Sequence, residues 1–149
     1  MTRLLGVDLG ERRIGLAVGE VGVPARGLAV LTRSTSERDA ATLQALAAEQ
    51  GATELVVGLP RNMDGSEGAQ ALATRSWAEA IGALTGLPVT LRDERLTSVA
   101  AEANLGRVRR GRSGGPPSRA ALARRRGAVD REAARLILQA ELDARAAAR

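Results

Sequence analysis

The 149-residue sequence has no cysteine, no histidine and no lysine, and Trp77 is its only aromatic residue. Without cysteine there is no disulfide and no thiolate nucleophile, and without histidine there is no imidazole base and no histidine ligand for zinc. Any bound metal must therefore be held by oxygen atoms, which favours a hard cation, Mg²⁺ or Mn²⁺.

The scarcity of aromatic residues also limits how the chain can bind nucleic acid. Proteins that hold single strands use several aromatic side chains as stacking platforms, and one tryptophan does not provide them. Trp77 lies in an alanine-rich stretch that predicts a helix, so we expect it in the core.

Length and hydrophobicity set the broad class of the protein. A chain of 149 residues predicts one domain with a single core, covering residues 1–149. No apolar run approaches the roughly 20 residues of a membrane span, and the N-terminus has no signal-peptide pattern. We therefore expect a cytoplasmic protein that does not bind membranes.

The net charge of +5 is distributed unevenly along the chain. The segment 106–126 has eight arginines and no acid, so the rest of the chain carries a net charge of −3. Positive charge concentrated among glycines and prolines predicts a mobile basic segment that binds a polyanion. The alternative is a solvated loop in which an arginine-rich composition has no binding role.

The order of the predicted elements indicates an α/β fold. Apolar patterns predict strands at 4–9, 14–18, 27–32, 54–59 and 88–92, and helices at 36–50, 69–84, 98–105 and 130–145. Three strands followed by alternating helices and strands is the order of the ribonuclease H-like fold, a five-stranded mixed sheet in the order 3-2-1-4-5 with flanking helices. Ligands in such sheets gather at the carboxyl ends of the strands.

Asp8 stands inside the first apolar run, close to the end of the central strand. Burying an unpaired carboxylate costs several kcal/mol, so Asp8 must be solvated in a cleft or neutralised by a cation. Gly10 and Gly15 leave the neighbouring backbone bare, which lets a phosphate or another strand approach. The alternative is a turn aspartate that only ends the strand.

Two further acids stand at suitable places for a site around Asp8. Glu94 follows the strand 88–92, and Asp130 opens the predicted last helix, where small residues one turn later let the helix lie close to the sheet. Three carboxylates without histidine fit two-metal phosphodiester hydrolysis. Taken singly, Asp130 is also a candidate helix N-cap and Glu94 a candidate surface ion pair with Arg95.

The second carboxylate has a competitor, Glu67. The strand 54–59 lies beside the central strand, so Glu67 in the following loop starts closer to Asp8 than Glu94 does. We favour Glu94 because the end of a strand positions a side chain more rigidly than a loop with glycines. Glu67 is the reserve metal ligand, and turn and capping chemistry is its other interpretation.

Four motifs, taken in order and spacing, resemble the YqgF/RuvX family over nearly the whole chain. They are GVDLG (6–10) with RIG (13–15), VGLPRNMDGSE (57–67), DERLT (93–97) and VDREAA (129–134). Members of that family are described as pre-16S ribosomal RNA nucleases and as Holliday junction resolvase-like proteins. The resemblance implies a ribonuclease H-like fold, a cytoplasmic location, a divalent-metal nuclease that matures the 5′ end of 16S ribosomal RNA, and catalytic acids at Asp8, Glu94 and Asp130.

Basic and amide side chains near these motifs and in the segment 106–126 are the candidates for binding the substrate backbone. They are Arg12, Arg13, Asn62, Arg95, Arg107, Arg109, Arg110, Arg124, Arg125 and Arg126. The family commonly has a lysine before the last motif, where this chain has Arg124, Arg125 and Arg126. Arginine keeps the charge and adds bidentate phosphate binding.

The sequence leaves the physiological substrate open between precursor ribosomal RNA and branched, four-way DNA. A junction resolvase requires a dimer that matches two-fold DNA, and the sequence does not choose between a monomer and a homodimer. A non-catalytic RNA-binding assembly factor is a further alternative, against which the three acids argue because they would repel phosphate. An ATPase of the actin and sugar-kinase class needs two such domains, which a chain of this length does not supply.

Overall fold

The computed structural model describes residues 2–95, 97–106 and 114–149. Within them lie five strands, β1 (Arg3–Leu9), β2 (Arg13–Glu20), β3 (Val23–Thr32), β4 (Ala52–Leu59) and β5 (Val89–Asp93). The helices there are α1 (Ser36–Gln50), α2 (Ala69–Thr85), α3 (Thr97–Leu105) and α4 (Arg119–Ala147).

The strands form one mixed sheet in the order β3-β2-β1-β4-β5. β1 pairs antiparallel with β2, as β2 does with β3, whereas β1 pairs parallel with β4 and β4 with β5. This is the strand order and direction of the ribonuclease H-like fold, so the predicted fold class is confirmed. β1 is the central strand, with Asp8 near its carboxyl end.

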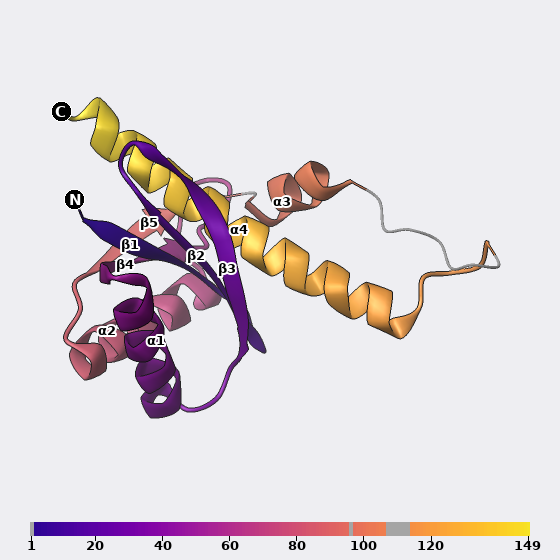
Figure 1. Ribbon diagram of the computed structural model, residues 1–149, viewed down its shortest axis with the longest axis horizontal. Coiled ribbons are helices and arrows are strands. Elements are labelled where there is room, and N and C mark those ends of the chain that lie inside the picture. The colour runs from indigo at the N-terminus through magenta and orange to yellow at the C-terminus, as the bar shows by residue number, and fades with distance from the viewer. Residues whose placement is uncertain (1, 96, 107–113) are drawn as a thin grey trace.

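Helices cover both faces of the sheet, as Figure 1 shows. α1 and α2 lie on one face and α4 crosses the other. Because side chains alternate along a strand, Val7 and Leu9 of β1 enter the core beneath α1 and α2, whereas Leu4 packs with α4. Asp8 shares the α4 face with Leu4. Trp77 is 5% exposed and belongs to the α1–α2 core, as expected.

Local capping signals explain why α1 has the predicted bounds. Thr35 Oγ1 accepts a hydrogen bond from the Arg38 backbone N–H at 3.1 Å, which satisfies a free donor at the start of the helix. Gly51 ends the helix at φ 70°, a left-handed conformation that favours glycine. Glycine ends α2 in the same way, at Gly86 with φ 72°.

The predicted start of the last helix is wrong by eleven residues, because α4 begins at Arg119 and not at Asp130. Ser118 is its N-cap, with Oγ accepting from the Ala121 N–H at 3.1 Å. Alanine and arginine are strong helix formers, so the helix starts directly after the proline pair that precedes Ser118. Asp130 is therefore no N-cap, and residues 119–126 of the predicted basic segment are helical. Residues 107–113 of that segment lie outside the described residues.

α4 extends well beyond the sheet. Its C-terminal part lies across the strands, and its N-terminal part projects past their ends with α3 beside it (Figure 1). Arg125 Nη2 donates to the Glu102 backbone oxygen at 3.1 Å, and Asn104 donates to Glu132 at 2.8 Å, which joins the two helices. Within the described parts of the chain, no helix combines the length and apolarity that a membrane crossing needs.

Candidate active site

Asp8 and Asp130 are brought together by a glycine on the neighbouring strand. Asp8 pairs in register with Gly15 of β2. A Cβ atom on Gly15 would lie 2.1 Å from the Asp130 backbone oxygen, so only glycine lets α4 rest on the sheet here. The sequence correctly indicates close approach at Gly15, but the approaching group is the α4 backbone and not a phosphate or a strand. Gly10 has a different role, since its N–H donates to the Arg13 oxygen at 2.8 Å in the turn.

Glu94 reaches this site from the far side of β4. Its backbone N–H donates to the Leu59 oxygen at 3.0 Å, which fixes the chain just after β5. Its side chain lies over Gly58 of β4, where an added Cβ would be 2.9 Å from Glu94 Cγ and Cδ. A side chain at position 58 would block this path, so glycine clears the way from Glu94 toward Asp8.

Asp130 is held by an arginine of β2. Arg13 Nε donates to Asp130 Oδ2 at 2.6 Å, and the two side chains are 38% and 19% exposed. The sequence predicts Arg13 as a phosphate-binding residue and gives no indication of this partner. Arg13 and Gly15 are two residues apart in β2, so both lie on the face of the sheet that α4 covers. This spacing is the signal in the sequence that places Arg13 near the element packed on Gly15.

The other two carboxyl groups are strongly perturbed by their surroundings. Burial, and then the charge of Asp130, raises the pKa of Asp8 to about 6. Burial, and then the charges of Asp8 and Asp93, raises the pKa of Glu94 to about 8, against a hydrogen bond from Thr97 that acts in the opposite direction. Asp8 and Glu94 are thus buried carboxyl groups whose pKa values are raised further by neighbouring carboxylates, and a cation would be stabilised in such surroundings.

The donor chemistry fits a hard divalent cation, because all three predicted ligands are carboxylates. In residues 2–95, 97–106 and 114–149, however, no three acidic side chains form a ready-made metal-binding group. Oδ2 of Asp130 is instead engaged by Arg13. The shared metal role of Asp8, Glu94 and Asp130 stays a prediction.

Glu67, the reserve ligand, is engaged elsewhere. Its two carboxylate oxygens accept from Arg75 Nε at 2.5 Å and Nη2 at 2.7 Å, and Arg61 lies 3.5 Å away. These arginines lower the pKa of Glu67. The nearby Asp64 accepts from the backbone N–H and the hydroxyl of Ser66, which is turn chemistry. The structure thus gives Glu67 a role in holding its own loop.

Some of the predicted substrate-binding residues also build that loop. Asn62 donates to Ser66 Oγ at 3.0 Å, and Arg95 donates to the Met63 backbone oxygen at 3.1 Å while pairing with Asp93. Arg12 is exposed in the turn between β1 and β2.

The predicted arginines of the basic segment differ in their surroundings. Arg124 and Arg126 are exposed on α4, whereas Arg125 is bound to Glu102 of α3. Arg107, Arg109 and Arg110 lie outside the described residues, so their predicted roles have no structural account.

A five-stranded mixed sheet of this order, with helices on both faces, places the protein in the ribonuclease H-like class. The chain belongs to the RuvX family, described as Holliday junction resolvase, whose profile matches residues 2–144. The resemblance drawn from the sequence motifs is therefore confirmed.

Relatives match over almost their whole length. A protein of Symbiobacterium thermophilum is 42% identical over 97% of this chain and 94% of its own. One of Anaeromyxobacter dehalogenans is 46% identical over 97% and 98%. Both carry the name "Putative pre-16S rRNA nuclease". Among solved structures, RuvC of Thermus thermophilus is 16% identical with a TM-score of 0.45, covering 91% of this chain and 94% of that one.

Proposed function

We propose that this protein is a cytoplasmic, metal-dependent endonuclease that cuts precursor 16S ribosomal RNA near its 5′ end. The observation that carries the proposal is that Asp130 packs on Gly15, the partner of Asp8 in β2, while the Glu94 side chain lies over Gly58 of β4, the strand beside Asp8. Glycine at positions 15 and 58 leaves room for Asp130 and Glu94 to approach. The choice of substrate is supported by the names of the relatives.

The proposed roles follow from the surroundings of each side chain. Divalent cations held by the three carboxylates would activate water and stabilise the leaving oxygen in phosphodiester hydrolysis. Asp8 and Glu94 must lose their protons to act as ligands, and their raised pKa values make that loss dependent on pH. Arg12, exposed in the turn beside Asp8, is positioned to bind a phosphate of the substrate.

Cleavage of four-way DNA is the second candidate function, favoured by the description of the RuvX family. A resolvase cuts two strands symmetrically and therefore works as a homodimer with paired sites. A nuclease that trims one ribosomal RNA end needs no such pairing and can act as a monomer.

The test is a side-by-side cleavage assay on a precursor 16S RNA fragment and a four-way DNA junction, with Mg²⁺ or Mn²⁺. Asp8→Asn is the control, and we expect it to remain folded and to lose all cleavage. Metal-dependent cutting of the RNA near the mature 5′ end supports the proposal. Cutting of the junction alone would replace it with the second candidate, and no cutting of either by folded protein would exclude both.

A further inference from the structure

The part of α4 that projects beyond the sheet has two distinguishable faces. One face is fixed by Asp130, which contacts Gly15 and Arg13 of β2. The other is fixed by Arg125, which donates to Glu102 of α3. α4 is a continuous helix from Arg119 to Ala147. These contacts therefore determine on which side of the helix each residue in this region lies.

The helical repeat separates the arginines of this region into two groups. At about 100° per residue, Arg126 lies about 40° and Arg119 about 20° from the direction of Asp130. Arg124 and Arg125 lie about 120° and 140° from it on either side. Neighbours in the sequence thus face different surroundings, and two arginines share the face of the catalytic carboxylate.

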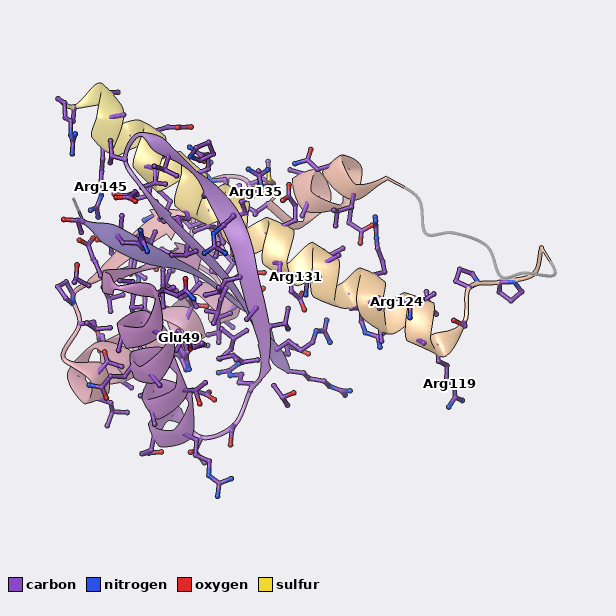
Figure 2. The ribbon with its side chains drawn as sticks, viewed as in Figure 1. Glu49, Arg119, Arg124, Arg131, Arg135 and Arg145 are labelled. Atoms are coloured by element: carbon purple, nitrogen blue, oxygen red, sulfur yellow. The ribbon has the colours of Figure 1, made fainter. Side chains whose placement is uncertain are left out.

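These two arginines stand in line with the candidate active site. With a rise of about 1.5 Å per residue, Arg126 is about 6 Å and Arg119 about 16 Å along the axis from Asp130. Both are exposed, and no acid lies between Arg119 and Asp130 in the sequence. In Figure 2, Arg119 extends outward from the first turn of the helix. The face therefore presents two exposed cationic groups at increasing distance from Asp130.

We propose that Arg126 and Arg119 form a phosphate ladder, a line of cationic side chains along which one nucleic-acid strand leaves the active site. The proposal rests on the proposed function, and it assigns no part in the ladder to Arg124 or Arg125. Guanidinium groups bind phosphate bidentately, and a strand close to Asp130 meets Arg126 first and Arg119 further out. Such contacts position the backbone and do not read sequence.

The test compares two double variants that remove the same charge. Arg119→Gln with Arg126→Gln removes the ladder, and Arg38→Gln with Arg149→Gln removes one exposed arginine of α1 and one at the C-terminus, neither of them a candidate for binding the substrate. Glutamine preserves helix propensity, and far-UV circular dichroism checks the fold. Binding of a labelled precursor 16S RNA fragment and of a four-way DNA junction is measured in EDTA at several salt concentrations.

We expect the ladder variant to reduce the slope of log affinity against log salt by about 1.4 on single-stranded RNA and about 1.8 on duplex DNA. The control variant should leave the slope close to that of the wild type. In cleavage assays the ladder variant should raise KM and keep kcat, as expected for residues that only position the backbone.

Equal slopes for the two double variants would overturn the ladder, and so would a loss of kcat without a change in KM. Wild-type protein that binds but cuts neither probe would refute the proposed function while leaving the comparison of slopes intact. Wild-type protein that binds neither probe would refute both proposals.

Discussion

Arg13 and Asp130 are 117 residues apart in the sequence and form an ion pair of 2.6 Å where α4 meets β2. Among the ion pairs of the described residues, it is the one that involves any of the three candidate catalytic acids. The contact uses Nε of Arg13 and one oxygen of Asp130. Arg13 therefore acts as a counter-charge inside a site that otherwise gathers carboxyl groups.

Replacing Arg13 by glutamine should change stability and metal affinity in opposite directions. Without its partner, the half-buried Asp130 carboxylate destabilises the metal-free protein by on the order of 1 kcal/mol. Mn²⁺ should bind more tightly, because no arginine competes for Asp130. Unfolding in EDTA and calorimetric titration with Mn²⁺ measure the two effects, and Arg12→Gln in the exposed turn is the matched control. Weaker Mn²⁺ binding would mean that Arg13 orients Asp130 for the cation.

Glu94→Gln and Glu67→Gln should separate the two candidates for the second carboxylate ligand. Loss of Glu94 removes charge that stabilises the bound cation and the transition state, so cleavage should fall by about 100-fold or more. Loss of Glu67 disturbs its pairs with Arg75 and Arg61 in the loop, so cleavage should change little. Single-turnover rates at saturating Mg²⁺ make the comparison, and the reverse ranking would transfer the ligand role to Glu67.

The raised pKa values predict that the metal-free protein loses stability as pH rises. Glu94 has a folded pKa of about 8 against an ordinary value of 4.5, so between these values the native state keeps a proton that the unfolded state releases. The free energy of unfolding therefore falls from about pH 5 to about pH 8, and Asp8 adds to the fall up to about pH 6. Thermal unfolding in EDTA should show this decline in the wild type and a much flatter profile above pH 6 in Glu94→Gln. A decline that survives in the variant would assign it to other groups.

Gly15→Ala should displace α4 from the sheet. The new Cβ would lie 2.1 Å from the Asp130 oxygen, which is backbone and has little freedom to move. Overpacking of this kind costs about 1–3 kcal/mol, and cleavage should fall further because Asp130 moves with the helix. Gly68→Ala is the control, since its Cβ would be 3.5 Å from the nearest atom. Equal unfolding midpoints for the two variants would refute the close contact.

The parts of the fold that follow from local pattern could be predicted from the sequence. α1 has the predicted bounds because Thr35 and Gly51 are strong local signals for the ends of a helix. The start of α4 is not evident from the sequence because glycines, prolines and arginines together resemble a loop. The signal that does indicate it is Ser118 after the proline pair, since a serine followed by alanines and arginines is an N-cap pattern.

The candidate site shows where such prediction ends. The three acids could be proposed from their places at strand ends and near small residues. The Arg13–Asp130 pair could not, because it depends on how α4 lies across β2. The role of Gly58 could not be predicted either, because the Glu94 side chain lies over this residue only when β4 and β5 are paired in the sheet. These contacts join elements distant in the sequence, and no local pattern encodes them.

The placement of Asp130 on α4 also bears on when the proposed site is assembled during synthesis of the chain. Asp8 lies on β1, the first strand in the element order, whereas α4 comes last in that order and begins at Arg119. A growing chain in which α4 has not yet been synthesised leaves the glycine-containing face of the sheet uncovered. It also lacks Asp130, one of the three candidate carboxylates. The proposed site is therefore complete only after nearly the whole chain has been synthesised, up to and including α4.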